Sequence, residues 1–265
     1  MSVALAVFRR DAKLALSYPM NFAMPWLSIV VSVTSFSYVS KLVAPSQLLG
    51  VQGKTATYFA YVIVNVAYTV LLATALQSFA NVVRRDQLTG TLESILVSPA
   101  TLPVVAIASG VWPLTLSALQ VLLYLCLGWV FGLDLAQMNV PTLCAFLVLG
   151  VTCMGSLGLI AAAVVVAYKQ APPSGLLVGG AASLLAGVMF PVTLLPEPLR
   201  IVSWFFPLTH ALAGMRGAMS GLRLTDLVGD AVWLALATAI LLPVALVLLH
   251  LLVERAKQDG TLAFY

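Results

Sequence analysis

Long apolar stretches without a charged residue alternate with short polar segments along this chain. Six stretches contain no Asp, Glu, Lys or Arg, and each of them holds between 23 and 40 residues. A helix that crosses a bilayer needs about 20 apolar residues, so each stretch has room for one such helix. The pattern therefore predicts an all-α membrane protein with six transmembrane helices, near residues 22–43, 58–80, 102–131, 140–167, 174–190 and 231–253.

Two segments outside these spans have the mixed character of amphipathic helices. Residues 1–20 combine apolar side chains with Arg9, Arg10 and Lys13, which predicts a helix lying in the membrane interface. A frayed tail that carries charges for topology is the alternative. Residues 84–97, between the second and third spans, place leucines at helical spacing beside charged side chains. They predict a short amphipathic helix at the membrane surface, with a solvated connector as the alternative.

The segment 191–225, between the fifth and sixth spans, is apolar but interrupted by prolines. Because proline lacks a backbone N–H and fixes φ, it starts or ends helices. The spacing predicts two short re-entrant helices, near 197–205 and 208–220, that dip into the outer leaflet. An ordinary folded outer loop is the alternative.

Composition supports lipid as the solvent for most of the chain. Of its 265 residues 62% are hydrophobic and 8% are charged, and the mean hydropathy is +1.06. An ordinary soluble domain carries about 25% charged residues, which it needs to cover its surface. The net charge of +4 comes without a basic stripe with interleaved aromatics, so a nucleic-acid partner is not expected.

The distribution of basic residues predicts the orientation of the chain. Six spans put both termini on the same side of the membrane. With that side cytoplasmic, the inner segments hold eight of the thirteen Lys and Arg residues, which agrees with the positive-inside rule. We therefore expect a single transmembrane domain, residues 1–265, in the plasma membrane (the inner membrane of a bacterium) with both termini in the cytoplasm.

The chain lacks the motifs of an enzyme or a metal site. Gly53-Lys54-Thr55 resembles the end of a phosphate-binding loop, but that loop requires a glycine where this chain has Leu48. Neither His210 nor His250 has a carboxylate or cysteine neighbour in sequence, which favours structural or interfacial roles. We predict no catalytic residue, no metal ligand and no cofactor bound by this chain. If ATP drives the protein, another subunit must bind it.

Small and hydroxylated residues in two spans predict helix contacts. Gly175, Gly179, Ser183 and Gly187 follow at four-residue spacing in the fifth span, a pattern that lets another backbone approach closely. A dimer interface and internal packing are equally open interpretations. The first span contains six Ser or Thr residues, which either bond the preceding turn of their own helix or line a slightly polar path.

Two segments carry a resemblance to a known family. Residues 85–99 contain Gly90-Thr91-Leu92-Glu93 and end in Val97-Ser98-Pro99, and they resemble the cytoplasmic coupling segment of type-2 ATP-binding-cassette (ABC) exporter permeases. Residues 190–216 contain Leu195-Pro196, Trp204, Pro207-Leu208-Thr209 and Arg216. They resemble the segment between the last two spans in the same family.

The resemblance implies a permease subunit of an efflux complex that exports an amphipathic substrate such as a drug, a lipid or a lipid-linked glycan. Two ATP-binding subunits would hold ATP and Mg, and a second permease copy or a paralogue would complete the complex among membrane lipids. A passive channel or ion-coupled carrier and a membrane scaffold are the alternatives. The resemblance implies ATPase coupling by Arg84, Arg85, Asp86, Leu88, Gly90, Thr91, Leu92 and Glu93, a dimer interface at the fifth-span stripe, and an outer gate at Pro196, Trp204, Pro207 and Arg216.

Overall fold

The structure, a computed structural model, describes residues 3–42, 58–88, 102–168 and 182–258. All regular elements in these ranges are helical, which confirms the predicted all-α class. In chain order they are α1 (Val3–Ser17), α2 (Pro19–Ser40), α3 (Tyr58–Leu88), α5 (Leu102–Val130), α6 (Val140–Tyr168), α8 (Ala182–Leu185), η4 (Val192–Leu194), α9 (Glu197–Trp204), α10 (Pro207–Met219), η5 (Leu224–Leu227) and α11 (Val228–Gln258).

Five of the described helices are long and apolar enough to cross a membrane. They coincide with the first, second, third, fourth and sixth predicted spans, and their apolar windows are 22–40, 58–86, 107–130, 140–167 and 224–255. The protein is therefore a multi-pass membrane protein. The second predicted span is too short: α3 continues beyond residue 80 because Val83 is still buried against α6 and α11.

The fifth predicted span, 174–190, lies partly outside the described residues. In its described part, α8 ends at Leu185 instead of continuing to residue 190. Gly187 has φ +71°, a left-handed conformation that glycine adopts at little cost and that cannot continue a helix. The prediction of a continuous helix through residue 190 is thus wrong, and the six-span count remains a prediction.

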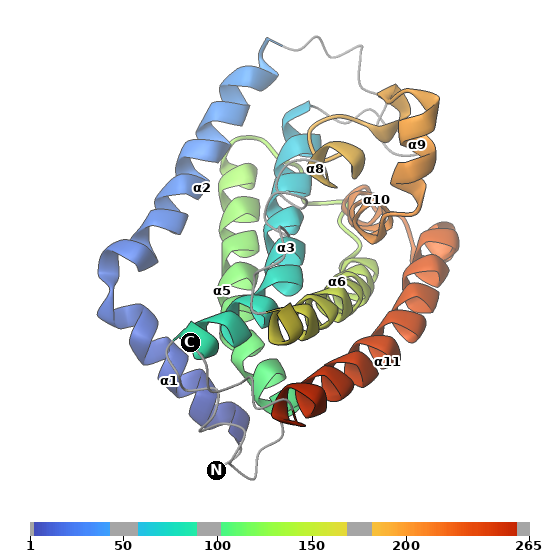
Figure 1. Cartoon of the computed structure of the whole chain (residues 1–265). Helices are drawn as coiled ribbons and strands as arrows, with labels where there is room; N and C mark the ends of the chain where they lie inside the picture. Colours follow the sequence, from blue (N-terminus) through green and yellow to red (C-terminus); the bar gives the residue numbers. More distant parts are fainter. Residues whose placement is uncertain (1–2, 43–57, 89–101, 169–181, 259–265) are drawn as a thin grey trace.

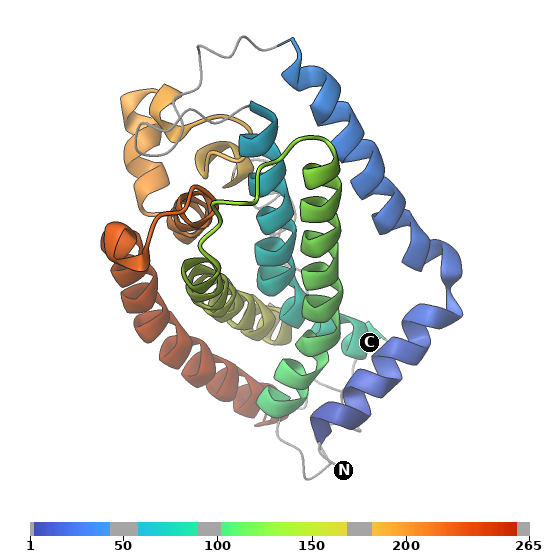
Figure 2. The same ribbon diagram turned by 180° about the vertical axis from the view of Figure 1, so that it is seen from behind.

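The helix α6 lies at the centre of the bundle. It packs between α3 and α11, and α3 in turn packs against α5 (Figure 1). The helix α10 crosses one end of this group and contacts α3, α6 and α11. On the opposite side, α1 lies along α5, and α2 runs along the outside of α3 and α5 (Figure 2). The start of α1 and the end of α11 lie at the same end of the molecule, away from α9 and α10.

The core forms where α3, α6, α10 and α11 meet. Tyr68, Phe146, Leu212, Met215 and Leu234 are fully buried there. Two glycines make room for close contacts between helices, one with a backbone and one with a side chain. A Cβ at position 158 on α6 would lie 2.6 Å from the backbone oxygen of Leu76, and one at position 214 on α10 would overlap the Phe146 ring.

The first two helices meet at an elbow. The helix α1 occupies most of the segment predicted to lie in the interface, and its Arg9, Arg10 and Lys13 are exposed. Its location in the interface stays a prediction. Tyr18 separates α1 from α2, which begins at Pro19; the missing N–H of a proline is tolerated in the first turn.

Candidate functional site

Charged side chains join α1 to the end of α3. The Asp11 carboxylate, only 6% exposed, accepts a hydrogen bond from Arg10 Nε at 3.0 Å and lies 3.6 Å from Arg85 Nη2. Arg85 Nε also lies 4.0 Å from Oδ1 of Asp86, a second buried carboxylate. Buried charges require partners, so one guanidinium neutralises carboxylates on two helices. We call Arg10, Asp11, Arg85 and Asp86 the inner cluster.

The inner cluster includes two of the predicted coupling residues, and the end of α3 corrects the predicted start of the helix 84–97. Arg84, Arg85, Asp86 and Leu88 belong to the last turns of α3 and do not begin a separate helix. The reason is the apolar face of α3, which stays buried to this depth. Leu88 is 66% exposed at the helix end. The remaining predicted coupling residues, Gly90, Thr91, Leu92 and Glu93, lie outside the described residues.

A second polar group lies at the other end of the bundle and centres on Asn65 of α3, which is fully buried. Its Oδ1 accepts a hydrogen bond from Arg216 Nη1 at 2.9 Å. Its Nδ2 donates to the carbonyls of Gly187 and Val188 at 3.3 and 3.0 Å. The Tyr61 hydroxyl donates to the Gly187 carbonyl at 2.7 Å. These side chains satisfy carbonyls that the end of α8 leaves outside any helix. We call Tyr61, Asn65 and Arg216 the outer cluster.

The outer cluster changes the interpretation of the small-residue stripe. Gly187 lies outside the helix and is buried against α3 of the same chain, so it is not the fourth member of a helical stripe. Ser183 lies in α8, and Gly175 and Gly179 lie outside the described residues. At Gly187 the structure therefore favours internal packing. The dimer contact of the other three positions stays a prediction.

Arg216 points inward from α10. Its guanidinium lies 5.2 Å from the centre of the Tyr61 ring, and its buried Nε has no hydrogen-bond partner. Within the described ranges no carboxylate lies at ion-pair distance from it. Burial lowers the pKa of the Arg216 guanidinium, whereas the nearby Tyr61 and Asp230 raise it. Arg216 thus fastens α10 to α3.

The other predicted gate residues lie at the same end of the molecule. Pro196 immediately precedes α9, and Pro207 is the first residue of α10. Trp204, the last residue of α9, is 57% exposed. Short helices therefore exist at both positions expected from the prolines. Their re-entrant placement and their gating role stay predictions.

His210 on α10 has partners that the sequence did not indicate. Its Nδ1 lies 2.6 Å from Asp230 Oδ1 on α11, and its Nε2 lies 2.7 Å from the Trp204 carbonyl oxygen. The ring stacks on Trp233 with centroids 4.4 Å apart. Burial lowers the pKa of His210, but the bonds to Asp230 and Trp204 outweigh it and raise the pKa above its ordinary value. Asp230 was missed because 20 residues separate it from His210.

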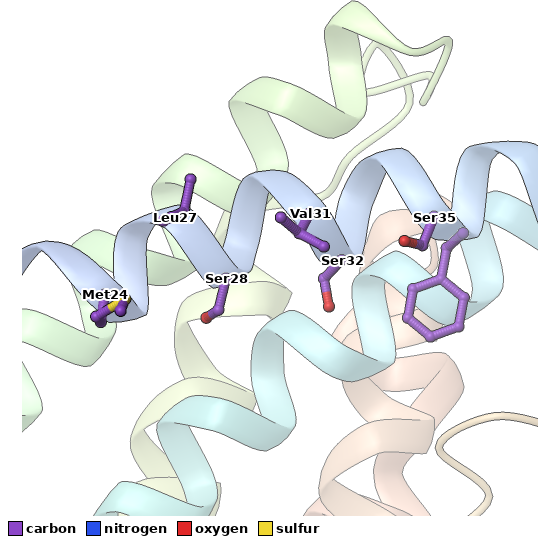
Figure 3. Close-up of a pocket in the computed structure, with 7 residues that line it drawn as sticks. Met24, Leu27, Ser28, Val31, Ser32 and Ser35 are labelled. Carbon is purple, nitrogen blue, oxygen red and sulfur yellow. The ribbon is translucent and has the colours of Figure 1, made fainter.

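A groove runs along α2, with a cavity volume of about 470 Å³. Ser28 and Ser32, one turn apart, project from the same side of the helix (Figure 3). The Ser28 hydroxyl bonds the Pro25 carbonyl, and Thr34 likewise bonds Val30. These bonds agree with the interpretation that the hydroxyls of this span bond the preceding turn of their own helix. The groove is lined by Met24, Leu27, Ser28, Val31, Ser32, Ser35 and Phe36.

Comparison with known families gives a match that covers most of the chain. The model of a family described as ABC-2 type transporter matches residues 3–220, from α1 through α10. The match includes both the inner and the outer cluster. A comparison with curated proteins found no match.

Proposed function

Because the chain belongs to the ABC-2 type transporter family, we propose that it is the permease of an exporter and moves an amphipathic substrate out of the cytoplasm or the inner leaflet. The family match over residues 3–220 carries this proposal. A drug, a lipid or a lipid-linked glycan would be the substrate. ATP hydrolysis would take place on a separate subunit, which also holds the Mg ion.

The inner cluster supports a route by which that subunit would act on the membrane helices. The chain leaves α3 at Leu88 and enters the segment proposed to dock on the ATPase, whose contacts would include Gly90, Thr91, Leu92 and Glu93. Arg85 lies just before this segment and pairs with Asp11 of α1. A displacement of the segment would therefore move α1 and α3 together.

The groove on α2 supports an amphipathic substrate. It combines four apolar side chains with three serines, two of which Figure 3 shows on one side of the helix. An apolar surface with a few hydroxyls suits a molecule that has both apolar and polar parts. The helix α2 is also little covered by the rest of the chain, which leaves room for a second permease copy or a paralogue.

The complete complex would contain two permeases and two ATP-binding subunits. We place it in the plasma membrane with both termini cytoplasmic, so that the inner cluster faces the ATPases. The outer helices α9 and α10, with Pro196, Trp204, Pro207 and Arg216, would then close the pathway on the opposite side.

The test is ATP turnover by the membrane complex that this chain forms with its ATPase. Glu93→Ala and Gly90→Pro are compared with the wild type, and Glu197→Ala, an exposed glutamate on α9, is the matched control. We expect normal assembly in all cases, with turnover stimulated by a fluorescent phospholipid impaired only in the first two variants. If no ATPase copurifies, the permease proposal fails and a channel or a scaffold becomes the better hypothesis. If both variants match the wild type, residues 84–93 do not couple the subunits.

A further inference from the structure

His210 faces two oxygen acceptors at once. Asp230 Oδ1 and the Trp204 carbonyl oxygen lie 2.6 and 2.7 Å from its two ring nitrogens. A neutral imidazole has one N–H, and a carbonyl oxygen cannot donate. Both bonds can therefore form only if the histidine is an imidazolium or if Asp230 carries a proton. In the first case both ring nitrogens donate, and the Asp230 oxygen and the Trp204 carbonyl both accept.

The surroundings favour the charged ring. Trp233 stacks on it at 4.4 Å, and the face of an indole attracts a cation. The charged groups on the elements packed against α10 are few in the described ranges. Besides Asp230 they are Arg216 on α10, the exposed Glu197–Arg200 pair on α9, and Asp226 on η5, which accepts the Arg223 N–H. The others lie far from His210: Arg84, Arg85 and Asp86 at the far end of α3, and Glu254, Arg255 and Lys257 at the far end of α11. Asp230 is the one that contacts the ring.

We propose that His210 is a protonated junction that holds the end of α9 and the start of α11 against α10, and that loss of its proton on the outer side loosens these helices. The junction joins three elements through one ring. Its effect on transport rests on the proposed function, whereas the protonation state and the helix contacts do not.

The direction of the response follows from the bonds. The protonated ring gains two partners on folding. The stabilisation that it gives the folded state is therefore fully present below the ordinary pKa of histidine. As the pH rises through the point at which folded His210 loses its proton, one nitrogen becomes an acceptor facing an acceptor. One bond is then lost, either to Asp230 or to Trp204. The outer helices are therefore held below the pH at which folded His210 loses its proton and released above it.

The first test measures the protonation state of the His210 ring. The chain has two histidines, so a His250→Gln variant with ¹⁵N-labelled histidine gives NMR signals from His210 alone. In the purified full chain we expect two protonated ring nitrogens at pH 6.5 and a titration midpoint above that value. Asp230→Asn should lower the midpoint by about 1 unit or more, because the neighbouring negative charge is gone. One deprotonated ring nitrogen at pH 6.5, or an unchanged midpoint in Asp230→Asn, would overturn the proposal.

The second test measures how firmly the outer helices are held. Amide hydrogen exchange of residues 197–219, corrected for the intrinsic effect of pH, should increase several-fold as the pH passes through the midpoint. His210→Gln should abolish this change, and His250→Gln, which removes an exposed histidine near the other end of α11, should keep it. Should His210→Gln fail to fold, Asp230→Asn must still shift the exchange transition to lower pH. A transition that is the same in all variants contradicts the junction and leaves the permease proposal untouched, since neither test requires an ATPase.

Discussion

At the scale of single residues, Asn65 joins three parts of the molecule: α3, α10 and the chain that follows α8. Its one amide bonds a side chain of α10 and two carbonyls that follow α8. The sequence singled out Arg216 through family resemblance but gave no sign of this partner, which lies 151 residues earlier. The spacing of apolar residues predicts that a helix spans the membrane, but it does not predict which helix faces which.

Asn65→Ala should therefore be costly. It removes the acceptor for Arg216 and a donor to two buried carbonyls, and each unsatisfied buried group costs about 1–3 kcal/mol. We expect a loss of about 3 kcal/mol in the free energy of unfolding, measured by denaturant titration in mixed micelles. Tyr61→Phe removes one hydrogen bond to the Gly187 carbonyl and should cost about 1 kcal/mol. A larger loss in Tyr61→Phe than in Asn65→Ala would contradict this account of the outer cluster.

At the scale of helices, the charge-free stretches predicted the five long helices of the described residues, but not where each helix ends. The helix α3 passes through Arg84 and Arg85 because its apolar face stays buried beneath these charges. The helix α8 stops at Leu185 because of a glycine conformation that the pattern of apolar residues does not encode. Charge marks where a chain reaches water, whereas packing and backbone conformation decide where a helix stops.

Two glycines on α6 allow a matched test of the contact between α3 and α6. A Cβ at position 158 would lie 2.6 and 2.7 Å from two backbone oxygens of α3, whereas one at position 155 would lie 3.4 Å from the Phe79 ring, an ordinary contact. Gly158→Ala should lower the apparent melting temperature, at a cost of about 1–3 kcal/mol for overpacking. Gly155→Ala should be neutral or stabilising, because alanine favours helices. Equal melting temperatures for the two variants would show that the helices have room to separate.

At the scale of the whole molecule, the two polar clusters mark opposite ends of the bundle. The loop between α5 and α6 lies at the end of the outer cluster, where the Asn139 N–H donates to the Ala218 carbonyl of α10. The inner cluster lies where α1 meets the end of α3. The distribution of Lys and Arg predicted which end of the bundle faces the cytoplasm. Helix packing alone does not determine this orientation.

Cysteine labelling tests that orientation. In a background without Cys126, Cys144 and Cys153, Asp134→Cys and Glu197→Cys should react with a membrane-impermeant maleimide applied to intact cells. Lys13→Cys should react only after the membrane is permeabilised, because it would lie on the cytoplasmic side. All three positions are exposed, so accessibility across the membrane decides the result. The opposite labelling pattern would invert the assignment of inner and outer ends.

The elbow at Tyr18 separates α1, which is bound to the bundle, from α2, which is little covered by the rest of the chain. The Asp11–Arg85 pair fixes α1 to α3, so α1 moves with the central bundle. Beyond the elbow, only 17% of the apolar window of α2 is buried, compared with 61% for α3. If the proposed coupling segment displaces the end of α3, we expect α1 to follow and α2 to change its angle at Tyr18. In the proposed orientation, a small displacement on the cytoplasmic side would then move the groove, which Met24 to Phe36 line along α2.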